Sequence, residues 1–129
     1  MPLNIDLYKK MFLIRKSEEM IQKHYLNDKM KTPMHMSMGS EAIVVGVCHN
    51  LKNDDQILST YRSHAAYLAK TDNTDNFFAE MYGKDSALIK GKGGSMHLID
   101  PPKGHMGSSA IVASSIPCAT GLAFSNKYL

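Results

Sequence analysis

The chain has 129 residues, 43% of them hydrophobic, so it can bury the core of one domain and is too apolar to be disordered. Its net charge of +3 arises from 15 basic and 12 acidic residues with no basic block, which argues against nucleic acid binding. No apolar run reaches the about 20 residues of a membrane span and no targeting signal opens the chain, so we expect a globular, cytoplasmic protein.

A long amphipathic helix is expected from about Asp6 to Met30. Apolar residues recur at helical spacing and form one buried stripe, which consists of Leu7, Met11, Ile14, Ile21 and Tyr25. Charged residues, Glu18 among them, are expected on the other faces. Pro33 then breaks the helix.

The next helix is expected over residues 41–48, after a possible cap at Ser40. Its residues are apolar on nearly all sides, so we expect it deep in the fold. The preceding segment contains Met34, Met36 and Met38 around His35. Thioethers and imidazole suit copper(I), but methionines that adapt to a core or an interface are the commoner case.

Shorter elements are expected in the rest of the chain: an extended run over residues 56–60, helices over 65–70 and 75–82, and a helix from Pro117 onward. The polar hinge at residues 71–74 offers a helix cap, and Gly83 is well placed to end the helix over residues 75–82. Alternating strands and helices favour the α/β class. The strands are few for such a domain, so we expect the front part of something larger.

Arg62, between Tyr61 and His64, follows the extended run. The planar donors of arginine match phosphate oxygens, although an ion pair with a nearby carboxylate is an equally good interpretation. His64 and His97 are the histidines best placed in a site, because imidazole exchanges protons near neutral pH. A single histidine is nevertheless more often a structural hydrogen-bond donor.

Glycines at positions 91, 93 and 94 predict a loop whose backbone can lie close to a ligand. The loop does not fit the common phosphate-binding patterns, because Gly93 follows Lys92 and Met96 stands where a glycine is needed. Neither zinc spacing nor a nucleophile elbow is present. Cys48 and Cys118 are expected to be free thiols, and Cys118 is better explained by burial than as a nucleophile.

Taken together, these residues resemble the N-terminal part of the alpha subunit of thiamine-diphosphate-dependent 2-oxo acid dehydrogenases, the decarboxylating first component of the pyruvate, acetoin and branched-chain complexes. The segments that carry the resemblance are residues 39–42, 61–64, 80–84, 91–98, 111–112 and 116–117. The resemblance implies the mostly helical start of a three-layer α/β/α domain that binds thiamine diphosphate. Residues 1–31 would be a packing or assembly helix, and residues 32–129 the start of an incomplete cofactor domain.

The resemblance also implies a set of site residues. Tyr61 and Arg62 match residues that contact the diphosphate of the cofactor, and the backbone at Ala110 and Val112 matches positions that meet its aminopyrimidine. His64 and His97 match histidines at the active centre and are the catalytic candidates. Branched-chain members add a possible potassium site, whose positions match Ser109, Ile111, Ser114 and Ser115.

The family binds Mg²⁺ through a Gly-Asp-Gly motif and a later asparagine pair, and neither occurs in this chain. The resemblance therefore implies thiamine diphosphate with Mg²⁺ only in a longer protein, and a chain that binds the cofactor poorly by itself. The implied reaction is oxidative decarboxylation of a 2-oxo acid such as pyruvate, with a beta subunit and a lipoyl acyltransferase component as partners in an oligomer. The alternative is a non-catalytic helical module that self-associates through apolar surfaces.

Overall fold

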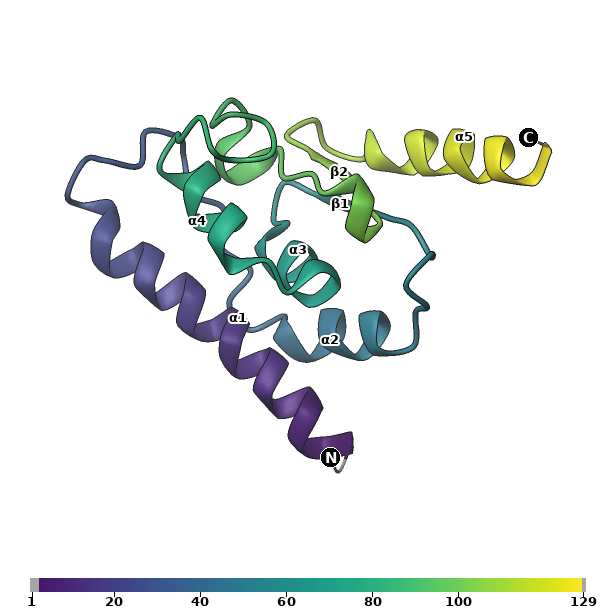
Figure 1. Cartoon of the computed structure of the whole chain (residues 1–129), viewed down its shortest axis with the longest axis horizontal. Coiled ribbons are helices and arrows are strands. Elements are labelled where there is room, and N and C mark those ends of the chain that lie inside the picture. The colour runs from purple at the N-terminus through teal and green to yellow at the C-terminus, as the bar shows by residue number, and fades with distance from the viewer. Residues whose placement is uncertain (1–2, 129) are drawn as a thin grey trace.

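The computed structural model describes residues 3–128, which form five helices, two strands and two short 3₁₀ turns (Figure 1). The helices are α1 (Leu3–Tyr25), α2 (Glu41–His49), α3 (His64–Thr71), α4 (Thr74–Met81) and α5 (Ser115–Tyr128). The strands are β1 (Ile57–Thr60) and β2 (His105–Ser109), and the 3₁₀ turns are η1 (Gly94–Met96) and η2 (Pro101–Lys103). None of these helices is both long and apolar enough to cross a lipid bilayer.

Strands β1 and β2 pair in parallel, and their last residues, Thr60 and Ser109, are partners in the register. Parallel pairing requires a long crossover, which here contains α3, α4 and the glycine loop. Both strands therefore end at the same edge of the sheet. The combination of several helices with a small parallel sheet agrees with the expected α/β class.

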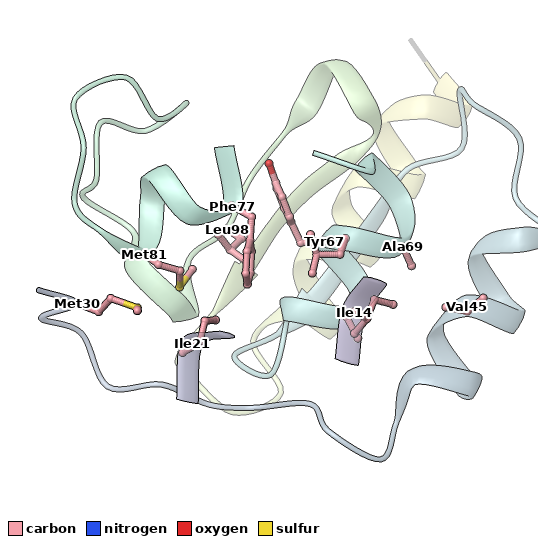
Figure 2. Packing of buried hydrophobic residues seen from close by; sticks show 11 residues of the cluster. Ile14, Ile21, Met30, Val45, Tyr67, Ala69, Phe77, Met81 and Leu98 are labelled. Atoms are coloured by element: carbon pink, nitrogen blue, oxygen red, sulfur yellow. The ribbon is translucent and has the colours of Figure 1, made fainter. Parts of the chain in front are cut away.

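The core lies where α1, α3 and α4 meet (Figure 2). Its largest buried apolar side chains are Ile14, Ile21, Tyr67, Leu68, Phe77, Met81 and Leu98. The ring of Phe77 stacks on Tyr67 at 6.2 Å between centroids and meets the ring of His64 edge to face at 5.2 Å. Such ring pairs add specificity to the burial of apolar surface.

The local sequence signals predict most element ends. Helix α1 ends at Tyr25 rather than Met30, but the expected stripe residues Ile14 and Ile21 are buried. Asn73 caps α4, because its side chain accepts a hydrogen bond from the Asn76 N–H, at 3.1 Å. Gly83 follows that helix in the left-handed region, with φ of 63°.

Helix α2 is not buried as its composition predicts. Val45 is buried, but Ile43 is 70% exposed and Val47 is 57% exposed. The helix packs against α1 and α3 on one side only, and nothing in the described part of the chain covers the other side. The prediction from composition was wrong because an apolar helix is buried only when a partner is present on each of its faces.

Helix α5 extends away from the rest of the molecule, past the end of the sheet (Figure 1). It begins at Ser115 with Pro117 in its first turn, as predicted, and none of its described residues is buried. Its contacts are mainly with β1, and Asn126 Nδ2 donates to Gln56 Oε1 at 2.7 Å. Ile116, Phe124 and Tyr128 are therefore exposed.

His105, in β2, is fully buried. Its Nε2 lies 3.1 Å from the Ser59 hydroxyl, and its ring meets the edge of Tyr67 at 5.4 Å. Burial lowers the pKa of His105 to about 4, because the apolar surroundings disfavour the imidazolium. The folded chain therefore holds this histidine in its neutral form at physiological pH.

This burial predicts a loss of stability in mild acid. The unfolded chain binds a proton at His105 near pH 6.5, whereas the folded chain does so only near pH 4. The stabilisation is thus fully present above pH 6.5 and is lost as the pH falls toward 4, by about 3 kcal/mol in total. Urea unfolding followed by circular dichroism should show a flatter pH dependence for His105→Gln, whereas exposed His49→Gln should keep the wild-type slope.

Candidate functional site

Two of the predicted site segments leave the sheet at the same edge. Tyr61 and Arg62 directly follow β1, and residues 110–112 directly follow β2. Since the two strands are parallel neighbours that end in register, these segments start side by side. Ligands of parallel α/β sheets bind at this edge, outside the carboxyl ends of the strands.

Arg62 presents an exposed guanidinium at this edge. Its Nη1 donates to the Met36 carbonyl oxygen at 2.6 Å, and the group lies 5.8 Å from the ring centroid of Tyr61. Within residues 3–128 it forms no ion pair, so the alternative of a carboxylate partner is wrong for the described chain. Its remaining donors are available to an anion.

Tyr61 is half-buried, and its ring meets the edge of His35 at 5.0 Å between centroids. On the neighbouring strand end, Ala110 is exposed and Val112 is 76% exposed. The edge therefore combines one cation, two rings and an apolar side chain. His35 is a neighbour of Tyr61 that the sequence suggested only as a copper(I) ligand and not as part of this site.

His97 lies at the end of the glycine loop, next to β2. Its exposed ring places Nδ1 at 3.3 Å from the Ser108 carbonyl oxygen. The Ser108 hydroxyl donates to the carbonyl oxygens of Met96 at 2.9 Å and Leu98 at 3.3 Å. These bonds fasten His97 beside the strand that leads to Ala110.

His64 is placed differently from His97, because it is fully buried at the start of α3. Its Nδ1 lies 2.9 Å from Glu18 Oε1, and its Nε2 lies 2.7 Å from the Ser95 hydroxyl. Both ring nitrogens are thus occupied inside the protein. In this arrangement His64 acts on the glycine loop through Ser95 rather than by touching a ligand.

Glu18 is the main residue that sequence reasoning missed, because it was expected on an exposed face and is 0% exposed. Its Oε1 accepts hydrogen bonds from the Ser37 N–H at 2.7 Å and the Ser37 hydroxyl at 2.9 Å, besides His64. The available signal was its spacing, four residues after Ile14 and three before Ile21, which puts it on the buried stripe.

Glu18, His64 and Ser95 are connected by hydrogen bonds in the same sequence as the residues of a hydrolase triad. In such a triad a carboxylate orients an imidazole, which activates a hydroxyl. The Ser95 residue is fully buried, however, and its Oγ also accepts a hydrogen bond from the His35 N–H at 3.3 Å. A nucleophile needs an open path to its substrate, which this hydroxyl lacks. The three residues therefore form a structural link between α1, α3 and the loop.

The oxygens at the predicted potassium positions gather in the turn before α5. The Ser114 hydroxyl lies 2.8 Å from both Ser109 Oγ and the Ile111 carbonyl oxygen. Ser109, Ser114, Ser115 and Cys118 line a hollow of about 210 Å³ between the strands and α5.

Cys118 is exposed, so its predicted burial is wrong. Residues 3–128 contain no group of three His, Cys, Asp or Glu side chains that could hold a metal.

Arg62, His97 and Val112 are brought to one end of the sheet, but the hollow at that end is lined by other residues. A cavity of about 540 Å³ lies elsewhere, between α1 and residues 33–38, and is lined by the three methionines Met34, Met36 and Met38 with Ile21 and Tyr25. The candidate site is therefore an open surface in the described chain rather than a closed pocket.

Comparison with known proteins gives a consistent result. Residues 9–129 match the family model described as dehydrogenase E1 component. The alpha subunit of acetoin:2,6-dichlorophenolindophenol oxidoreductase from Bacillus subtilis is 39% identical over 122 residues, which cover 95% of this chain and 37% of that protein. The pyruvate dehydrogenase E1 component subunit alpha of Porphyra purpurea is also 39% identical over 122 residues, covering 95% and 36%. The chain thus spans little more than a third of the length of these relatives.

The buried link predicts that Ser95→Ala destabilises the chain. The substitution leaves His64 Nε2 and the His35 N–H without their partner, which costs about 1–3 kcal/mol of unfolding free energy. Urea unfolding at neutral pH measures this loss. Ser86→Ala, in an exposed turn, is the matched control and should change stability by less than about 0.5 kcal/mol. Equal stabilities of the two variants would contradict the link.

Proposed function

The chain belongs to the dehydrogenase E1 component family, and we propose that it forms part of the alpha subunit of a thiamine-diphosphate-dependent 2-oxo acid dehydrogenase. The proposed reaction is oxidative decarboxylation of a 2-oxo acid such as pyruvate, with transfer of the acyl group to a lipoyl carrier. One observation carries the proposal: residues 61–62 and 110–112 leave two neighbouring parallel strands at the same edge. Its partners would be a beta subunit and a lipoyl acyltransferase component.

The residues at this edge fit the proposed cofactor. A diphosphate requires positive charge and several donors, and Arg62 offers an exposed guanidinium with no carboxylate partner among the described residues. Tyr61 stands beside it as a second polar group. The aminopyrimidine would meet the backbone at Ala110 and Val112, where the exposed Val112 side chain supplies an apolar support.

When bound, thiamine diphosphate supplies the electron sink for decarboxylation, and the protein supplies binding and orientation. Arg62 would hold the diphosphate, and His97 would hold or move a proton at its exposed ring. His64 would position the loop through Ser95. Residues 1–31 would serve packing and assembly, and residues 32–129 would begin a three-layer cofactor domain.

The proposal involves potassium and magnesium, and this chain contains the expected positions for potassium only. Potassium would be held near Ser109, Ile111, Ser114 and Ser115, where the Ser114 hydroxyl lies 2.8 Å from both the Ser109 hydroxyl and the Ile111 carbonyl oxygen. Magnesium prefers octahedral oxygen ligands, and its family motif is not part of this sequence. Arg62 and backbone dipoles would therefore bear the diphosphate charge alone in this chain.

The proposal predicts weak but localised cofactor binding, with Kd about 1 mM. Thiamine diphosphate titrated into ¹⁵N-labelled chain should shift the amide resonances of residues 61–62, 97 and 110–112. Arg62→Gln should abolish the shifts, because it removes the cation that meets the diphosphate. Lys92→Gln is the matched control, since Lys92 is an exposed cation on the neighbouring loop. Chemical shift changes scattered over the chain, or no changes at millimolar cofactor, would contradict the proposal. A micromolar Kd would contradict the prediction that this chain binds the cofactor weakly.

A second candidate function, self-association, is supported by the uncovered apolar faces of α2 and α5. Ile43 and Val47 on α2 and Ile116 and Phe124 on α5 are exposed. Monomeric proteins rarely expose continuous apolar patches, and such patches commonly mark interfaces.

Self-association through α2 predicts that Ile43→Lys weakens the assembly at least about tenfold, because a charge would be buried in the interface. Sedimentation velocity over a range of concentrations measures this effect. Leu26→Lys changes an apolar residue away from α2 that is even more exposed, 91% against 70% for Ile43, and should leave the assembly unchanged. A wild-type chain that stays monomeric at every concentration would exclude this function.

A further inference from the structure

The glycine loop is folded around a carboxylate of the chain itself. Glu80, in the last turn of α4, is 1% exposed. Its Oε1 accepts hydrogen bonds from the N–H groups of Gly93 at 2.7 Å and Gly94 at 3.1 Å, and its Oε2 accepts one from the Gly91 N–H at 3.2 Å. Three loop amides therefore converge on one side chain.

Successive backbone N–H groups that point into one concavity form an anion site, which in many proteins takes a phosphate. Here the anion is the buried carboxylate of Glu80. Bonds between a charged carboxylate and amide donors are about twice as strong as neutral ones, and a buried carboxylate without them would be very costly. The loop N–H groups and the Glu80 carboxylate thus supply each other's hydrogen-bond partners.

The loop glycines are required by this arrangement. Gly91 and Gly94 have φ of 70° and 56°, in the left-handed region that glycine adopts readily. A Cβ at Gly94 would lie 2.5 Å from Thr32 Oγ1, and one at Gly93 would lie 2.6 Å from the His97 carbonyl oxygen. The backbone that Glu80 holds is therefore packed directly against the backbone of His97.

We propose that Glu80 is a positioning residue, whose carboxylate occupies the anion site of the loop and thereby fixes the backbone that carries His97. It follows that the loop amides do not take an external phosphate, and that a ligand at this end of the molecule meets His97 instead. Only the role of His97 toward a ligand rests on the proposed function. The attachment of the loop to Glu80 is independent of it.

A second attachment supports the same geometry from another side. Ser95, in η1, is held by His64 and thus by Glu18 on α1, and its N–H donates to Thr32 Oγ1 at 3.2 Å. The loop is therefore fixed on its inner side by two buried acids from different helices. Lys92 and His97 remain exposed on its outer side.

The test compares Glu80→Gln with Asp75→Asn, which removes one charge from an exposed position of the same helix. In Glu80→Gln the side-chain amide turns a donor toward the loop, so the amides of Gly91, Gly93 and Gly94 should exchange about tenfold to a hundredfold faster. Their proton resonances should move upfield, and the ring resonances of His97 should shift. Circular dichroism and slow exchange in α1 and α3 should stay as in the wild type, as they should for Asp75→Asn.

A measurement on the wild-type chain covers the case in which Glu80→Gln does not fold. The N–H groups of Gly91, Gly93 and Gly94 should each show a scalar coupling through the hydrogen bond to the carboxyl carbon of Glu80, because all three donate to that carboxylate. Millimolar inorganic phosphate should leave them unmoved. Unchanged amide exchange in Glu80→Gln, missing couplings to the Glu80 carboxyl carbon in the wild type, or phosphate-induced shifts at these amides would each overturn the proposal. If thiamine diphosphate shifts no residue at the sheet edge while the Glu80 effects appear, the proposed function fails and the attachment stands.

Discussion

The buried carboxylate of Glu18 is the interaction on which the arrangement of the chain depends. It lies in the apolar stripe of α1 and accepts hydrogen bonds from Ser37 and His64, so it joins α1 to the segment before α2 and to α3. His64 extends the link to Ser95 in the loop. Glu18 Oε2 has no hydrogen-bond partner among the described residues, so all of these hydrogen bonds are made by Oε1. The loss of Ser37 or His64 as a donor would therefore weaken the hydrogen bonding of a buried carboxylate.

Glu80 holds another part of the loop by the same kind of interaction. Each acid is buried, each accepts hydrogen bonds from backbone N–H groups, and each shares the buried face of its helix with large apolar side chains. The inner side of the site is therefore built from acids that hold the backbone, while its outer side carries Arg62 and His97. This division explains why two histidines that look alike in sequence differ: His64 belongs to the inner side and His97 to the outer side.

The sequence predicts features that depend on neighbours in the chain. A cap within residues 71–74, which is Asn73 in the structure, Gly83 as a helix end and Pro117 in a first turn are all decided within a few residues. The burial of Glu18 and Glu80 was not predicted, because a carboxylate enters a core only when distant residues supply its donors. The exposure of Ile43 on α2 was missed for the related reason that composition describes a helix and not the presence of its partners.

The two candidate functions use different surfaces and can therefore be tested separately. Figure 1 shows α2 and α5 on opposite sides of the sheet. Association through Ile43 and Val47 on α2 would leave the edge with Arg62 open, whereas association through Ile116 on α5 would approach that edge, because the turn before α5 follows β2 directly. An assembly that Ile43→Lys disrupts is thus compatible with cofactor binding at Arg62. An assembly that competes with the cofactor must instead involve α5.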